Sequence, residues 1–188
     1  MKPFFSLLLG AGLLFSSANT FAQMSDDKTV EVGGSPMYPS KDIIDNAVNS
    51  KDHTTLVAAV KAAGLVETLK GAGPFTVFAP TNEAFAKLPA GTVDDLLKPE
   101  NKAQLVKVLT YHVVAGRIGS KALLKMIRKA GGKATLKTVQ GDNLYASADD
   151  SGMITIWDEN GNKSMITISD VWQKNGVIHV VDTVLLPK

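Results

Sequence analysis

The residues of this sequence that could do chemistry are its histidines and the acids near them, because cysteine is absent. His179 and Asp182 stand three positions apart, and such a pair can hold a metal or orient a catalytic base. On the strand predicted there, alternate side chains point to opposite faces, so these two diverge. His112 lies among apolar neighbours, which is typical of a hydrogen-bonded core residue. His53 lies among polar residues and is predicted to be exposed.

Recognisable reaction motifs are absent. The sequence contains no Gly-x-Ser-x-Gly elbow, no His-Glu-x-x-His, no phosphate loop and no dinucleotide fingerprint. Asp158, Asn160 and Asn162 alternate oxygen groups as a calcium loop does, but the later glycine and glutamate are missing, which favours a hairpin turn. We therefore expect no enzyme, no metal and no cofactor. A hydrolase assembled from distant residues, with Asp182 and His179 as candidates, remains an alternative.

The N-terminus predicts export. A lysine precedes an apolar run and then small residues, the layout of a secretory signal peptide over residues 1–22. We expect cleavage after Ala22, with cleavage after Ala18 as the alternative. The apolar run is shorter than the roughly 20 residues that span a bilayer, although a retained anchor remains an alternative. The mature chain is therefore predicted to be secreted or periplasmic, with no membrane span.

The secondary structure that must position these side chains is predicted to change along the chain, from helices in the first half of the domain to strands in the second. Residues 23–37 are polar and contain glycine, which predicts a flexible arm before a single domain over residues 38–188. The first half of that domain shows helical spacing of apolar residues, as at Leu56, Ala59, Val60 and Ala63. Ser40 and Thr81 are predicted to cap helices of this half.

The second half is rich in β-formers separated by turns. Asp-rich and Asn-Gly turns, including Asn175-Gly176, predict an antiparallel meander. Two earlier runs, 75–79 and 111–114, are predicted to be extended and to join the same sheets, because isolated strands are not stable. The fold class is therefore α+β, with a cluster of helices in the N-terminal half.

Charge is nearly balanced overall. Removal of Lys2 with the signal peptide leaves 19 basic and 18 acidic residues, which does not indicate a nucleic-acid partner. The local basic stretch is interpreted as the solvated face of a helix; it comprises Lys121, Lys125, Arg128, Lys129 and Lys133.

Two long segments resemble the paired signatures of the fasciclin domain family. The first is Gly73-Pro74-Phe75-Thr76-Val77-Phe78-Ala79-Pro80-Thr81-Asn82-Glu83-Ala84-Phe85, and the second is Asn175-Gly176-Val177-Ile178-His179-Val180-Val181-Asp182-Thr183-Val184-Leu185-Leu186-Pro187. The resemblance runs from about Met37 to Pro187. It implies a wedge of two β-sheets with helices packed at one side, an extracellular or periplasmic place, and adhesion or protein contact.

The resemblance also implies candidate residues. The tyrosine-histidine pair of receptor-binding members corresponds to Tyr111 and His112, and their Asp-Ile pair corresponds to Asp170 and Val171. If residues 111–114 are extended, Tyr111 and His112 face opposite ways. Asp170 is alternatively a turn residue that caps backbone N–H groups. The structural motif residues are Pro80, Thr81, Asn82, Phe85, Asn175, Gly176, His179 and Asp182.

The predicted function is that of an exported, non-catalytic binding or adhesion module with a protein or cell-surface partner. The resemblance also allows an alternative, a carrier of an apolar small molecule such as a carotenoid or a lipid, since some fasciclin-like proteins bind carotenoids. Met126, Trp157 and Trp172 are the candidate lining of an apolar groove, and core packing is the other interpretation of these three residues.

Overall fold

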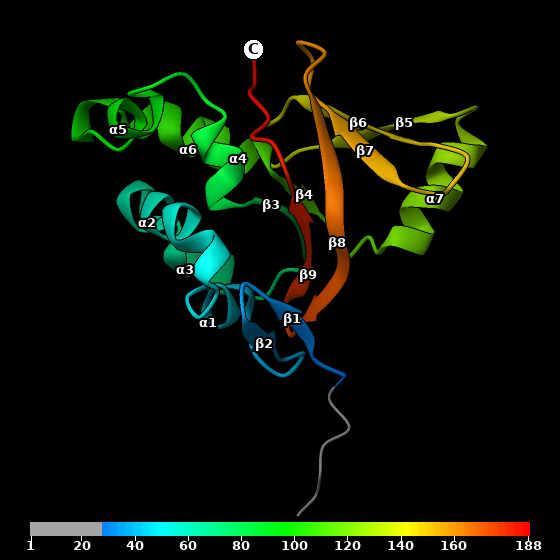
Figure 1. Cartoon of the computed structure of the whole chain (residues 1–188), viewed down its shortest axis with the longest axis horizontal. Coiled ribbons are helices and arrows are strands. Elements are labelled where there is room, and N and C mark those ends of the chain that lie inside the picture. Colours follow the sequence, from blue (N-terminus) through cyan, green and yellow to red (C-terminus); the bar gives the residue numbers. More distant parts are fainter. Residues whose placement is uncertain (1–27) are drawn as a thin grey trace, which may run out of the picture.

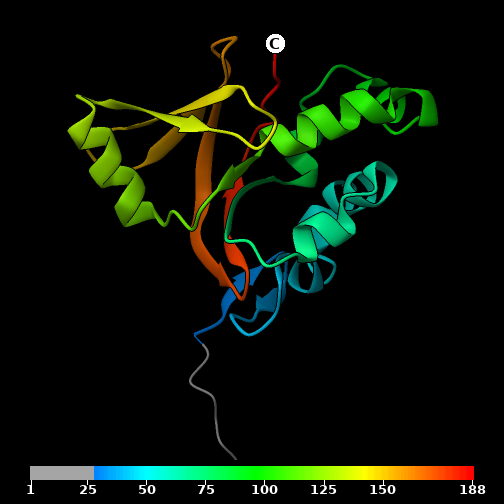
Figure 2. The same ribbon diagram turned by 180° about the vertical axis from the view of Figure 1, so that it is seen from behind.

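The computed structural model describes residues 28–188 (Figure 1). The predicted signal peptide and the first residues of the predicted arm lie outside this range. The helices, in chain order, are α1 (Ile43–Ala47), η1 (Lys51–His53), α2 (Thr54–Ala63), α3 (Val66–Lys70), α4 (Asn82–Ala86), α5 (Thr92–Leu96), η2 (Pro99–Asn101), α6 (Lys102–Tyr111) and α7 (Ser120–Lys129). All but α7 gather at one side of the sheet (Figures 1 and 2).

The strands form two sheets, which agrees with the predicted α+β fold class. They are β1 (Val30–Val32), β2 (Ser35–Met37), β3 (Phe75–Pro80), β4 (Val113–Ala115), β5 (Lys133–Lys137), β6 (Asn143–Ala148), β7 (Ile154–Trp157), β8 (Lys163–Gln173) and β9 (Gly176–Val181). The large sheet has the order β4-β3-β9-β8-β7-β6-β5, and only the β3–β9 pair is parallel. A bridge between Val114 and Thr138 joins its two ends into a near-barrel.

The prediction of a flexible arm over residues 23–37 is wrong for its last part. Strands β1 and β2 form an antiparallel hairpin in which Val30 pairs with Met37. Val32 and Met37 are buried in the core that also contains Ile43. The apolar side chains of this hairpin alternate with polar ones, so burial of one face stabilises a segment that looks polar in the sequence.

Helix caps agree with the sequence in one case and differ in another. Thr81 caps α4 by accepting a hydrogen bond from the backbone N–H of Ala84, as predicted. The cap of α1 is Asp42, whose carboxylate accepts from the N–H of Asp45, whereas Ser40 was predicted. Asp42 directly precedes the first helical residue, and a carboxylate there also suits the positive end of the helix.

The predicted extended run 111–114 is wrong at its start. Tyr111 is the last residue of α6 and His112 follows the helix, so β4 begins only at Val113. The β8–β9 turn also shifts by one residue: Lys174 and Asn175 lie between the strands, and Gly176 begins β9. A Cβ atom at Gly176 would collide with the carbonyl oxygen of Phe75, so close strand packing requires this glycine.

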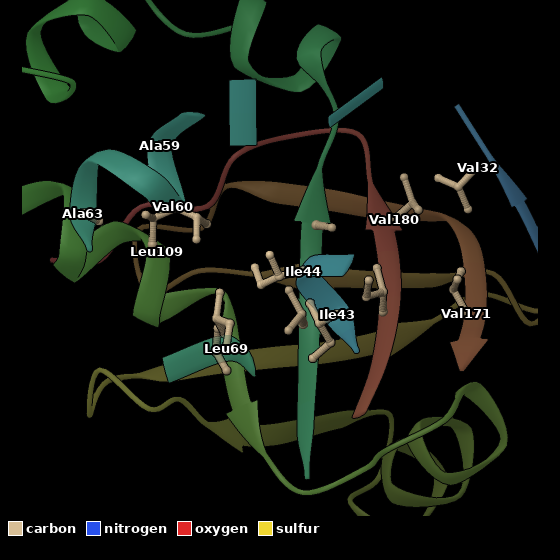
Figure 3. Close-up of a cluster of buried hydrophobic side chains, with 14 of the residues drawn as sticks. Val32, Ile43, Ile44, Ala59, Val60, Ala63, Leu69, Leu109, Val171 and Val180 are labelled. Carbon is tan, nitrogen blue, oxygen red and sulfur yellow. The ribbon is translucent and has the colours of Figure 1, made fainter. Parts of the chain in front are cut away.

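Two main apolar cores lie on the two sides of the bent sheet. One packs α1, α2, α3 and α6 against β3 and β9, and Ile43, Val60, Leu69 and Val180 lie within it (Figure 3). The other fills the near-barrel and includes Leu123 and Ile127 of α7, which cover the inner face of β5 and β6. Strand β8 changes register near Ile168, where bulges bend the sheet between the two cores.

Candidate functional site

His112 is held inside the fold. The backbone N–H of Leu185 donates to its Nε2 at 3.1 Å, so that nitrogen carries no proton. Its Nδ1–H therefore donates to the carbonyl oxygen of Val108 at 2.9 Å. The imidazole is neutral, and burial lowers the pKa of His112 from its ordinary value.

His179 is held in the opposite tautomer. The N–H of Asp170 donates to Nδ1 at 3.3 Å, and Nε2–H donates to the carbonyl oxygen of Ile118 at 2.8 Å. The ring is fully buried and stacks on Phe78, with 5.8 Å between the centroids. Burial lowers the pKa of His179 as well. This histidine ties β8, β9 and the segment before α7 together.

The prediction that His53 is exposed is wrong. Its ring is buried, and Nδ1 lies 2.9 Å from the hydroxyl of Ser50 while Nε2 lies 3.4 Å from the carbonyl oxygen of Ala79. Burial lowers its pKa. His53 is the last residue of helix η1, and its ring points towards β3, whereas Lys51 and Asp52 of the same helix are exposed.

Tyr111 and His112 do not form a surface contact. Tyr111 is fully buried, its hydroxyl donates to the carbonyl oxygen of Asn143 at 2.8 Å, and the same hydroxyl accepts from the N–H of Glu159 at 3.2 Å. Burial raises the pKa of Tyr111 to about 12. The candidate partner-contact role is therefore corrected for this pair. Tyr111 connects α6 to the start of β6, His112 connects α6 to the C-terminal segment at Leu185, and both rings are buried away from the surface.

Asp170 and Val171 are also structural in this fold. Val171 is buried, which corrects its candidate contact role. Asp170 is half-buried at a positive φ of 58°, within the irregular part of β8. Its carboxylate accepts from the N–H of Ser120 at 2.7 Å and from the hydroxyl of Ser120. It thus caps the start of α7, the alternative interpretation of this residue.

Replacement of Asp170 by alanine is expected to lower the free energy of unfolding by about 1.5–3 kcal/mol, because charged hydrogen bonds at a helix start are lost. Asp170→Asn keeps the acceptor for the Ser120 N–H and should cost clearly less. Urea unfolding at pH 7 measures both variants. A change below about 0.5 kcal/mol for Asp170→Ala would mean that the carboxylate is free for another role.

The remaining motif residues hold separate elements together. Asn175 donates from Nδ2 to the carbonyl oxygens of Leu69 and Gly71 at 2.7 and 2.9 Å, and its Oδ1 accepts from the N–H of Ile43 at 3.1 Å. Asn82 links η1 to α2, since it donates to the carbonyl oxygen of Lys51 and accepts from the N–H of Thr55.

Asp182 lies at the surface end of this framework. Its carboxylate accepts from the N–H of Met165 at 2.8 Å and pairs with the ammonium of Lys87 at 3.2 Å. His179 is buried within β9, whereas Asp182 follows the strand, and the two side chains have different hydrogen-bond partners. Pro80 ends β3, and Phe85 of α4 packs in a small core with Val108.

Comparison with known proteins agrees with this arrangement. The model of the fasciclin domain matches residues 51–187. The protein sll1483 of Synechocystis sp. is 43% identical over 183 residues, which cover 97% of this chain and 94% of that protein. The chain belongs to the fasciclin domain family.

Other relatives place this fasciclin domain among longer proteins. The cell surface glycolipoprotein MPB83 of Mycobacterium bovis is 36% identical over 147 residues, 75% of this chain and 58% of that protein. The solved structure of a FAS1 domain pair from the insect cell adhesion molecule Fasciclin I matches with a TM-score of 0.68 at 21% identity. The match covers 78% of this chain and 51% of the solved Fasciclin I chain. The latter likeness shows the fold.

The predicted apolar groove is not assembled in this fasciclin domain. Met126 packs on the near-barrel core, Trp157 lies on the opposite, outer side of the sheet, and Trp172 is exposed beside Gly119. The most enclosed apolar cavity lies elsewhere, between α1, α2, α3 and the sheet, and has a volume of about 70 Å³. A cavity of about 150 Å³ holds one benzene molecule, so this space is too small for a carotenoid. A more open hollow of about 530 Å³ lies beside α7, and Arg128, Asp149 and Asp150 are part of its lining.

The outward side chains of β5 to β8 form a surface that was not predicted from the sequence. Tyr145 and Trp157 are directly opposite each other on β6 and β7, and Lys163 is opposite Trp157 on β8. Lys133 of β5 lies over both rings. We call this surface, centred on these four residues, the outer sheet face. The signal in the sequence is the alternation of buried and polar residues in these strands, but their register depends on the turns.

Two further properties concern the described part of the chain. Residues 28–188 contain no group of three or more histidine, cysteine, aspartate or glutamate side chains placed to hold a metal ion. None of the helices in that range is long and apolar enough to cross a membrane.

Proposed function

We propose that this chain is an exported fasciclin domain that acts as a binding and adhesion module towards a protein or cell-surface partner and does not transform a substrate. One observation carries the proposal: the polar side chains of the two motifs are used within the fold, as at His179 and Asn175, and so is that of His112 between the motifs. Groups committed to buried hydrogen bonds are unsuited to attack a substrate. The surfaces that these residues position are left for contact.

Export and surface placement support the same proposal. The predicted signal peptide, with cleavage after Ala22, delivers the domain outside the cytoplasm. MPB83 is named a cell surface glycolipoprotein, and Fasciclin I is named a cell adhesion molecule. The carrier alternative is not favoured, because the enclosed apolar cavity of about 70 Å³ is too small for a carotenoid and the larger, open hollow beside α7 is lined by charged residues.

The test uses the absence of cysteine. Glu100→Cys places one label on the exposed helix η2, far in the chain from the motifs. The full chain is expressed in its source cells, and the mass of the exported product is measured by mass spectrometry. The labelled product is then titrated onto intact cells. We expect the mass of a chain that begins at Gln23, and saturable binding to the cell surface. A retained N-terminus, or binding no better than that of an unrelated labelled protein, would contradict the proposal.

A further inference from the structure

The outer sheet face presents flat aromatic rings in a fixed arrangement. Across four strands the outward row is Thr135, Tyr145, Trp157 and Lys163, each directly opposite the next. The indole N–H of Trp157 donates to the hydroxyl of Ser147 at 2.7 Å, which fixes the ring on the sheet. Both aromatic rings are only half-buried, whereas side chains on the inner side, such as Leu144 and Ile156, are fully buried.

Two ammonium groups lie on these rings. Lys133 Nζ is 4.6 Å from the ring centroid of Tyr145 and 5.1 Å from that of Trp157, and Lys163 Nζ is 4.5 Å from the ring centroid of Trp157. Both lysine residues are exposed. A lysine that rests on an aromatic face keeps its charge near the ring and can exchange this contact for an anion without leaving the surface.

The charge of this face has one sign. In the paired parts of β5 to β8 the charged side chains are Lys133, Lys137 and Lys163, and these segments contain no aspartate or glutamate. The cations of α7 lie on the helix that covers the inner face of the sheet, so they are not part of this face. Within residues 28–188 the ion pairs use other cations, namely Lys70, Lys87 and Lys98. Such a field attracts a polyanion.

We propose that the outer sheet face binds an acidic polysaccharide, with sugar rings packed on Trp157 and Tyr145 and their carboxylate or sulfate groups on Lys133 and Lys163. The apolar C–H face of a sugar ring matches a half-exposed aromatic ring, and charge-assisted hydrogen bonds match the anionic substituents. This inference rests on the proposed function, because export places the face where such polymers occur.

Two other polyanions are less well matched. Single-stranded nucleic acid also binds to surfaces of aromatic and cationic side chains, but it is not the usual ligand of a domain exported from the cytoplasm. A membrane-binding basic helix needs a free apolar side, whereas Leu123 and Ile127 of α7 are buried against the sheet. Both polymers serve as competing ligands in the test.

The experiment measures binding of the chain from Gln23 onward to a polyuronate by calorimetry at low salt. Neutral dextran, an oligothymidylate and vesicles of anionic lipid are the comparison ligands. We expect the polyuronate to bind best and more weakly as salt rises. The double variant Lys133→Gln/Lys163→Gln, and separately Trp157→Ala, should each raise the Kd about tenfold or more.

Matched controls make the result specific. Trp172→Ala removes the other tryptophan, and Lys61→Gln removes an exposed charge of the helical half; both should leave the Kd within about twofold. Trp157→Phe keeps a ring and should retain most of the affinity if Trp157→Ala unfolds. Equal loss in the controls, no polyuronate binding, or preference for the oligothymidylate or the vesicles would overturn the inference. Cell-surface binding that persists in such a case would leave the proposed function standing.

Discussion

Replacement of Asn175 by alanine is expected to lower the free energy of unfolding by about 3–6 kcal/mol. The substitution leaves three backbone groups without their partner: the N–H of Ile43 and the carbonyl oxygens of Leu69 and Gly71. The first two groups are buried and the Gly71 carbonyl is part-buried. A buried group left without a partner costs about 1–3 kcal/mol, and a part-buried one costs less because water can reach it. Asn175 joins α1, the end of α3 and the start of β9, so one side chain holds together parts of the chain that are more than 100 positions apart.

Urea unfolding at pH 7 measures this change, and the neighbouring Lys174→Ala is the control. Lys174 is exposed and its hydrogen bonds to Lys41 and Arg117 use its backbone, so its replacement by alanine should alter stability by less than about 0.5 kcal/mol. A loss below about 1 kcal/mol for Asn175→Ala would show that the three hydrogen bonds do not hold the elements together.

Stability is expected to fall steeply as the pH drops below about 6.5, the ordinary pKa of histidine. The chain has three histidine residues, and burial lowers the pKa of each one: His53, His112 and His179. Below the ordinary pKa the unfolded chain binds these protons and the folded chain does not. Stability is therefore complete above this pH and is lost at up to about 1.4 kcal/mol per pH unit for each histidine.

Equilibrium unfolding at pH 7.5, 6.5 and 5.5 checks this prediction. The aspartates with a lowered pKa, Asp45, Asp149 and Asp182, contribute stability that is lost only near pH 4 and below, so they do not act in this window. The loss of stability between pH 6.5 and 5.5 should shrink in a folded variant that lacks one histidine, such as His53→Gln. Equal stability at pH 7.5 and 5.5 would refute the account of the buried neutral histidines.

Some of the fold follows from local sequence alone. Thr81 after the proline that ends β3, and the Asp158 turn, act through hydrogen bonds a few residues away, and both are predicted correctly. Asp158 accepts from the N–H groups of Asn160 and Asn162, so these residues make a hairpin turn. Local chemistry decides such elements, and the sequence contains all of it.

Other features depend on contacts between distant segments. Tyr111 is a β-former, and two valines follow the histidine after it, yet packing extends α6 through Tyr111 and buries its ring against β6. His53 looks exposed because its neighbours are charged, but Ser50 and Ala79 enclose it. The outer sheet face depends on the register of four strands, which joins Lys133 and Lys163 across Trp157. Local propensity cannot predict these placements, since tertiary packing overrides it.

The central claim is that the signature residues and the Tyr111-His112 pair between them are framework, and the imidazole nitrogens of His112 and His179 test it most directly. Nitrogen-15 chemical shifts, recorded from pH 7.5 to 5.5 with and without bound partner, report the tautomer and the protonation of each ring. We expect both rings to be neutral while the chain is folded, with the proton on Nδ1 of His112 and on Nε2 of His179, and no change when the partner binds. An imidazole that titrates near pH 6.5 in the folded chain, or changes tautomer with the partner, would contradict the claim.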